Sequence, residues 1–198
     1  SDNGGERYSE VWPFRGTKGY LLEGGIRVPA IIRYPRRIAA GLQSDQFVLT
    51  MDYYPTMLEA AGVDYSHMTT DGISLLGLLE SGQTQDRTIF FSFQGHDQGA
   101  ARRGNWKYYS IEGNEFLYDL SVDTHERANR KDAEPEIHAE LKAAWLAWDA
   151  TQSPRDGMPG YCGDPAGQAL ELPRLDQSNC KDYGTARPGA APAGPPGG

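Results

Sequence analysis

The sequence predicts a small α+β unit, an antiparallel sheet of about four strands with one packed helix, preceded by a loop-rich segment. Three observations predict this fold class. Strand-like runs follow one another between residues 88 and 120, tight-turn dipeptides separate them, and an amphipathic helical pattern comes next. The chain therefore divides into a first segment at 1–84, the α+β unit at 85–152 and an irregular tail at 153–198.

The first segment begins as a loop, because glycines recur and prolines punctuate residues 1–29. Ala30-Ile31-Ile32-Arg33-Tyr34 is an apolar run ended by Pro35, which predicts a strand. A helix follows, since Thr50 or Asp52 can cap it and Pro55 falls near its first turn. Its apolar spacing predicts one buried stripe, formed by Tyr54, Met57, Leu58 and Ala61.

A short helical turn is expected at Leu75–Leu79, before the α+β unit. The strand-like runs are Thr88–Phe93, Trp106–Ile111 and Glu115–Leu120, with Ala100–Arg103 as a candidate fourth. Gly104-Asn105 and Gly113-Asn114 favour tight turns, so we expect an antiparallel meander. Pro135 opens the helix that follows. Its apolar face, expected to cover one face of the meander, contains Ile137, Leu141, Ala144, Trp145 and Trp148.

The composition is that of a globular domain with an unusual tail. Hydrophobic residues make up 38% of the 198 residues, enough for a core, and no apolar run is long enough to span a bilayer. The net charge of −8 argues against general nucleic-acid binding, which needs a basic face. Residues 184–198 are mostly Gly, Pro and Ala, which favours disorder. Cys162 and Cys180 lie in the tail, either as a disulfide or as two unrelated thiols.

Three short motifs near the N-terminus carry residue types that suit chemistry with anions. Asp2 and Asn3 offer two hard oxygen ligands that suit Ca²⁺ or Mg²⁺, although the same residues are typical of an Asx-turn. Lys18 lies between small residues and can approach an oxyanion closely, although a solvated loop lysine has the same pattern. Glu23 and Arg27 are expected to form an ion pair that holds a turn rather than a catalytic group.

Further motifs follow these three in a fixed order. They are Asp52-Tyr53-Tyr54-Pro55-Thr56-Met57-Leu58, Asp71-Gly72-Ile73-Ser74-Leu75, Arg103-Gly104-Asn105-Trp106-Lys107 and Phe116-Leu117-Tyr118-Asp119-Leu120. The ordered set, over residues 1–150, resembles the sulfatase family of the alkaline phosphatase superfamily, of the arylsulfatase and N-acetylgalactosamine-6-sulfatase type. The resemblance implies that residues 1–84 are the C-terminal end of a large catalytic α/β domain and that residues 85–152 are its C-terminal α+β subdomain.

The resemblance also implies roles for single residues. Asp2 and Asn3 would ligate a calcium ion, and Lys18 would bind the sulfate and stabilise charge on the leaving ester oxygen. His96 lies in a polar, glycine-bearing loop between two strands. The corresponding loop in sulfatases often faces the mouth of the active site, which implies a substrate contact, whereas the residues alone favour a surface histidine with no role. The implied substrate is a sulfated carbohydrate or an aryl sulfate ester.

The family's nucleophile is a formylglycine made from Cys or Ser in a Cys/Ser-x-Pro-x-Arg motif, and no such motif occurs in this chain. We therefore expect an N-terminal half of the same protein to supply the formylglycine and the other calcium ligands, in a periplasmic or secreted enzyme. This chain alone is expected not to hydrolyse an aryl sulfate. Two alternatives are a phosphonate or phosphodiester hydrolase of the same superfamily, and a non-catalytic module that docks on a separate chain.

Overall fold

A computed structural model describes residues 2–6, 8–93 and 96–152. Four antiparallel strands form one sheet in the order β1-β2-β3-β4: β1 Thr88–Phe93, β2 Gln98–Arg103, β3 Trp106–Ile111 and β4 Asn114–Asp119. The helices are α1 Glu23–Ile26, α2 Tyr53–Ala60, α3 Leu76–Ser81 and α4 Pro135–Asp149, with a 3₁₀ turn at Thr50–Asp52. The meander and its fourth strand are confirmed.

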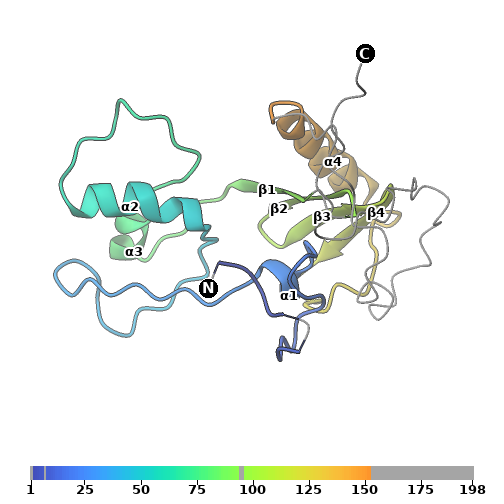
Figure 1. The fold of residues 1–198 in the computed structure, drawn as a ribbon, viewed down its shortest axis with the longest axis horizontal. Helices are drawn as coiled ribbons and strands as arrows, with labels where there is room; N and C mark the ends of the chain where they lie inside the picture. The colour runs from blue at the N-terminus through green and yellow to red at the C-terminus, as the bar shows by residue number, and fades with distance from the viewer. Residues whose placement is uncertain (1, 7, 94–95, 153–198) are drawn as a thin grey trace, which may run out of the picture.

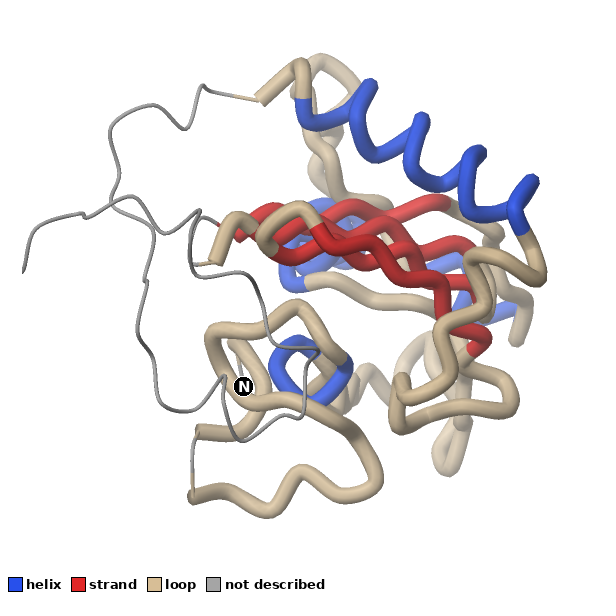
Figure 2. The backbone as a smooth tube through the Cα atoms, turned by 90° about the vertical axis from the view of Figure 1, so that its right-hand side faces the viewer, coloured by secondary structure: helices blue, strands red, loops and turns tan. Residues whose placement is uncertain are grey.

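Helix α4 covers one face of the sheet, as predicted (Figures 1 and 2). Leu141 and Trp145 of α4 are buried against Ala101, Tyr108 and Leu117 of the strands. The indole N–H of Trp145 donates to the carbonyl of Phe91 at 3.0 Å. The side chains of this core alternate along each strand with side chains of the opposite face, as the period of two in a β-strand requires.

The opposite face of the sheet is covered by the N-terminal segment, which the sequence did not predict. Figure 2 shows α1 and its flanking loops on the side of the strands away from α4. A second core forms here, in which Tyr20, Leu21 and Leu22 pack against residues of three strands: Ala100, Tyr109, Ile111 and Tyr118. The loop that carries Lys18 therefore lies directly beside the sheet.

Two elements of the first segment differ from their predictions. Residues 30–34 form no strand, and Ile31 is 92% exposed, because no described segment lies alongside to complete a ladder of backbone hydrogen bonds. Helix α2 forms, but its expected stripe is not buried: Tyr54 is 52% and Met57 66% exposed. The helix instead buries Pro55 and Thr56 toward α3, with which it lies apart from the sheet in Figure 1.

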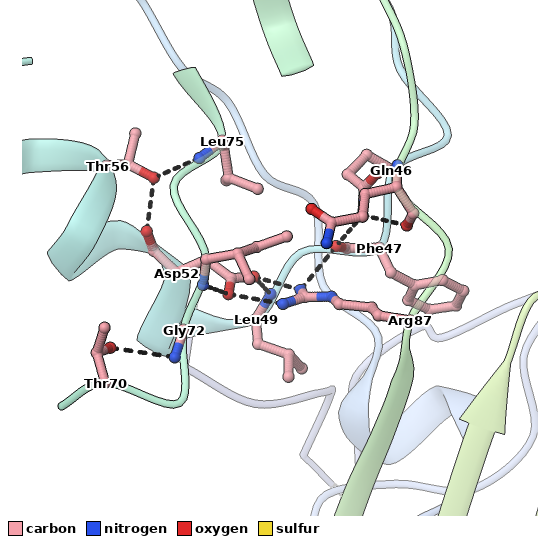
Figure 3. Close-up of polar contacts among 11 residues, drawn as sticks. Gln46, Phe47, Leu49, Asp52, Thr56, Thr70, Gly72, Leu75 and Arg87 are labelled. Carbon is pink, nitrogen blue, oxygen red and sulfur yellow. Dashed lines mark hydrogen bonds and ion pairs between the residues drawn. The ribbon is translucent and has the colours of Figure 1, made fainter. Parts of the chain in front are cut away.

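Hydrogen bonds of Thr56 and Asp52 explain why α2 turns the side with Pro55 and Thr56 toward α3. The Thr56 hydroxyl donates to the Asp52 carbonyl at 2.6 Å and accepts from the Leu75 backbone N–H at 2.9 Å. The Asp52 carboxylate accepts the backbone N–H of Leu49 at 2.7 Å (Figure 3). It also accepts the backbone N–H of Ile73 at 3.0 Å. Polar groups in the first turns of α2 thus bind the 70–76 segment, and these bonds fix the rotation of the helix.

The division expected at residue 84 stays a prediction. It falls in the connection between α3, which ends at Ser81, and β1, which begins at Thr88. The tail from residue 153, with Cys162 and Cys180, lies outside the described residues. Among the described residues, no helix has both the length and the apolar character that crossing a membrane requires.

Candidate functional site

The glycines of the first and third N-terminal motifs pair with each other through their backbones. Gly4 donates to the carbonyl of Gly25 at 2.8 Å, and Gly5 donates to the carbonyl of Gly24 at 3.2 Å. A Cβ atom added at Gly4 would lie under 3.0 Å from the carbonyl oxygen of Gly24. Real Cβ atoms almost never come so close, so the two backbone segments approach at a distance that only glycine permits.

The lysine loop joins this pairing. The backbone N–H of Lys18 donates to the carbonyl of Gly5 at 2.8 Å, and Gly24 donates to the carbonyl of Arg15 at 2.7 Å. A Cβ at Gly24 would meet the carbonyl oxygens of Gly16 and Arg15. The three motifs that the sequence singled out therefore form one interlocked layer of backbone, and this layer brings Asp2 and Lys18 to the same place.

Lys18 is exposed at this layer and forms an ion pair with Glu6. The Nζ atom of Lys18 lies 2.9 Å from Oε1 of Glu6, and the two side chains are 51% and 69% exposed. The hydrogen bond that Lys18 donates to Glu6 raises the pKa of Lys18, and the charges of Glu6 and Asp2 act in the same direction. Lys18 is consequently held protonated in a pair that solvent, or a ligand, can still reach.

Asp2 is exposed and Asn3 is half-buried. Their oxygens are of the type that a hard cation prefers, but Ca²⁺ takes about six to eight of them. Among the described residues, no cluster of three or more acidic, histidine or cysteine side chains is placed to hold a metal ion. Within the described part of the chain, the oxygens of Asp2 and Asn3 are thus of the type that Ca²⁺ prefers but are fewer than it requires.

His96 lies near the lysine loop. Its ring stacks on that of Tyr20, with centroids 5.5 Å apart and planes 16° apart. Its Nδ1 atom lies 2.8 Å from the Glu112 carboxylate. Tyr20 is two residues after Lys18, so the structure brings together the histidine and the lysine loop, which the sequence separates by some eighty positions.

Gln98 is a residue of this region that the sequence reasoning missed. It is fully buried at the start of β2, and its side chain binds the backbone of the lysine loop at Gly19 and Leu21. A signal was present, since Gln98 precedes the small residues Gly99, Ala100 and Ala101, and a glutamine that is buried there needs a polar partner. That partner lies 77 positions away, so no local pattern could have identified it.

Beneath the loop layer, Glu23 belongs to a buried group of charges. It pairs with Lys107 at 3.0 Å and with Arg102 at 3.0 Å, and Lys107 also pairs with Glu126 at 2.7 Å. The predicted pair with Arg27 is present at 3.6 Å, on the exposed side. Glu23 therefore holds the turn, as expected, but through partners from the sheet that the sequence did not indicate.

The pKa values of the two buried carboxyls, Glu23 and Glu126, are shifted in opposite directions. Burial alone would raise the pKa of Glu23, but the charges of Lys107 and Arg102 lower it below the ordinary value. Burial raises the pKa of Glu126, and Lys107 only partly opposes the shift. Glu126 also accepts the backbone N–H of Glu23 at 2.6 Å. This network ties α1, the sheet and the 126 loop together.

Arg102 and Arg103 each form an ion pair with a carboxylate. Arg102 is buried against Glu23 and lies over the ring of Phe47, with 3.6 Å between its guanidinium carbon and the ring centroid. Arg103 pairs with Glu140 of α4. Arg102 thus neutralises a buried carboxylate.

A groove of about 990 Å³ lies between the 26–49 segment, α3 and β1. Its lining is mainly apolar, and neither Asp2, Lys18 nor His96 contributes to it. Of the three N-terminal motifs, only the third lines the groove, through Glu23, Ile26, Arg27 and Val28. Charged side chains and solvent access coincide instead at the exposed face where Asp2, Lys18 and Glu6 lie.

Comparison with known proteins gives consistent matches. A family model described as N-sulphoglucosamine sulphohydrolase, C-terminal, matches residues 16–147. An uncharacterized sulfatase of Schizosaccharomyces pombe is 37% identical over 152 residues, which cover 70% of this chain and 27% of that protein. Human N-acetylgalactosamine-6-sulfatase is 36% identical over 114 residues, which cover 54% of this chain and 22% of that protein.

Solved structures show the same fold. The crystal structure of Ps i-CgsB matches with a TM-score of 0.69 and 20% identity, over 89% of this chain and 41% of that chain. BT4656, in complex with its substrate D-glucosamine-2-N,6-O-disulfate, matches with a TM-score of 0.56 and 23% identity, over 66% of this chain and 30% of that chain. The chain thus spans less than half the length of the proteins that it matches.

Proposed function

Because this chain belongs to the sulfatase family, with its sheet and α4 as the C-terminal subdomain, we propose that it forms part of a sulfuric ester hydrolase. In this proposal Lys18 binds the sulfate group, and Asp2 and Asn3 supply ligands to a calcium ion. The observation that carries the proposal is the interlocked backbone of the three N-terminal motifs, which brings a protonated lysine and a carboxylate to one exposed face.

The physical chemistry of the reaction supports a lysine in this place. Hydrolysis of a sulfate ester accumulates negative charge on the leaving oxygen and on the equatorial oxygens of the sulfate. A fixed positive charge stabilises such a transition state more than the substrate. The raised pKa keeps Lys18 positively charged, and its ammonium group is exposed, so a sulfate group can reach it. A calcium ion, when bound, would supply further positive charge beside the sulfate oxygens.

We propose a sulfated carbohydrate or an aryl sulfate as the substrate. BT4656 was solved with a sulfated glucosamine, and N-acetylgalactosamine-6-sulfatase is named for a sulfated sugar, so both relatives support this class. His96 is proposed as a substrate contact, since its ring stacks on Tyr20 next to the lysine loop. The nucleophile and the remaining calcium ligands are proposed to come from another part of the same protein, so that this chain alone is inactive.

The test uses the full-length protein and three substrates: an aryl sulfate, an aryl phosphonate and a phosphodiester with the same aryl leaving group. The proposal expects hydrolysis of the sulfate to exceed that of the other two, and a calcium chelator to abolish it. Asp2→Ala should raise the calcium concentration needed for half-maximal turnover, whereas Asp45→Ala, at another exposed loop position, should not. Preference for either phosphorus ester would favour the rival hydrolase, and turnover unaffected by the chelator would exclude the calcium role.

A further inference from the structure

The buried side chain of Gln98 connects the sheet to the lysine loop. Its Nε2 donates to the carbonyl of Gly19 at 2.9 Å. Its Oε1 accepts the backbone N–H of Leu21 at 3.0 Å and the hydroxyl of Tyr109 at 2.9 Å. Gln98 and Tyr109 are both 0% exposed, so water does not compete for these bonds.

The orientation of this amide follows from its partners. A backbone N–H can only donate and a carbonyl can only accept, so Oε1 must face Leu21 and Nε2 must face Gly19. Tyr109 agrees with this orientation, because burial raises the pKa of its hydroxyl well above the ordinary value and keeps it a proton donor. Only one orientation of the Gln98 amide therefore satisfies all three hydrogen bonds, and a flipped amide would not.

The two backbone groups that Gln98 binds lie directly after Lys18 in the chain. Gly19 has φ of 98°, a left-handed conformation that the loop must maintain at this point. On the other side, the backbone N–H of Lys18 is bonded to the carbonyl of Gly5. Lys18 itself is exposed, so its position depends on these backbone bonds before and after it rather than on packing of its side chain.

We propose that Gln98 is a positioning residue for Lys18: its amide fixes the Gly19–Leu21 backbone so that the lysine ammonium is held where the sulfate binds. This inference rests on the sulfatase function proposed above. A misplacement of about 1 Å in a catalytic group can cost about a hundredfold in rate. Loss of the Gln98 amide should therefore lower turnover although Gln98 contacts no substrate.

Two variants of the full-length enzyme test the hydrogen bond to Gly19 separately from those to Leu21 and Tyr109. Gln98→Met keeps the length of the side chain and removes the whole amide. Gln98→Glu keeps an acceptor for Leu21 and Tyr109 but loses the donor to Gly19. The matched control is Trp145→Phe, which removes a partly buried hydrogen bond to the Phe91 carbonyl on the opposite face of the same sheet.

We expect kcat for an aryl sulfate to fall by up to about a hundredfold in both Gln98 variants, with a much smaller change in KM, because the transition state is affected more than binding. Trp145→Phe should lower the unfolding temperature by as much as Gln98→Met and leave kcat unchanged. If kcat falls equally in Trp145→Phe, or does not fall in the Gln98 variants, the positioning role is wrong.

Hydrogen exchange gives a readout that does not depend on turnover. The amide of Leu21 should exchange slowly in the wild type and at least tenfold faster in Gln98→Met, whereas its rate should not change in Trp145→Phe. Equal protection of Leu21 in all three proteins would overturn the inference. Lys18→Ala distinguishes the two proposals: if this variant keeps full activity the sulfatase role of Lys18 fails, and if it loses activity while Gln98→Met does not, only the positioning role fails.

Discussion

The ion pair between Lys18 and Glu6 determines how the lysine titrates. A carboxylate 2.9 Å from an exposed ammonium group stabilises the protonated form, which is why the pKa of Lys18 is raised. The pair is open to solvent, so it adds little to stability and acts mainly on the charge state. Glu6 would therefore extend the pH range over which Lys18 can bind an anion.

Replacement of Glu6 tests this interpretation. Glu6→Gln removes the carboxylate, so we expect the pKa of Lys18 to fall toward the ordinary value for lysine, and the alkaline limb of kcat/KM to move to lower pH with it. NMR titration of the Lys18 Nζ group measures the first effect. Glu10→Gln is the control, because Glu10 accepts from the backbone of Trp12 instead. Identical titration of Lys18 in both variants would contradict the role of Glu6.

Asp52 is the buried carboxylate on which the 49–76 region depends. Burial alone would raise its pKa, but hydrogen bonds from Arg87, Leu49 and Ile73 lower it. Figure 3 shows how the Arg87 guanidinium faces the carboxylate, with Nη1 2.9 Å from Oδ1. Removal of one partner from a buried pair costs about 3–5 kcal/mol, because the other charge is left uncompensated.

We therefore expect Asp52→Ala to lose about 3–5 kcal/mol of unfolding free energy at pH 7. Because the folded pKa is lower than the unfolded one, the contribution of Asp52 is present above about pH 4 and is lost as pH falls through the folded value. Urea denaturation at pH 7 and pH 3 measures the difference, which should shrink in acid. Asp45→Ala, at an exposed position, should change neither. A difference that persists undiminished in acid would exclude this linkage.

Sequence reasoning identified Asp2, Asn3, Lys18 and His96 as candidates but not the residues that hold them. The groups that are proposed to act on an anion lie in short motifs, so a local pattern can identify them. Gln98 and Lys107 reach partners that are 77 to 84 positions away, and such pairs leave no periodic signal. Their burial also depends on the loop covering the second face of the sheet, which no pattern indicated.

At the scale of elements, the three N-terminal motifs depend on glycine for their close approach. We expect Gly24→Ala to be destabilising by about 1–3 kcal/mol, because its Cβ would overlap the carbonyls of Arg15 and Gly16. Gly77→Ala in α3 is the matched control, since its Cβ meets nothing within 4 Å, and alanine in a helix favours stability by up to about 1 kcal/mol. Equal urea midpoints for the two variants would show that the layer tolerates wider spacing.

The sequence predicted the meander and α4 well, because alternation and turn dipeptides are local. It was wrong about the strand at 30–34 and the buried stripe of α2. Both predictions assume a neighbour, a partner strand for Ile31 and an apolar surface for Met57, and the described residues contain neither. The same apolar pattern would be satisfied if another part of a larger protein covered these elements.

At the scale of the whole molecule, the chain has a buried centre and an exposed face that carries Asp2 and Lys18. The sheet, α4 and the Glu23–Lys107–Glu126 network form the centre, and the layer of glycine backbone attached to it presents Asp2 and Lys18. The relatives are longer, since this chain covers 27% of the S. pombe sulfatase. In the proposed function, the chain is a support that positions one side of a sulfatase active site.

Turnover of an aryl sulfate by the full-length protein, compared between Lys18→Ala and Lys142→Ala, tests the central claim most directly. Both variants remove a partly exposed lysine from an ion pair, with Glu6 in one case and Glu115 of β4 in the other. We predict that kcat/KM falls by about 10²–10³-fold in Lys18→Ala, as for loss of a group that stabilises transition-state charge, and stays unchanged in Lys142→Ala. Wild-type turnover by Lys18→Ala would contradict the claim that this lysine serves the sulfate site.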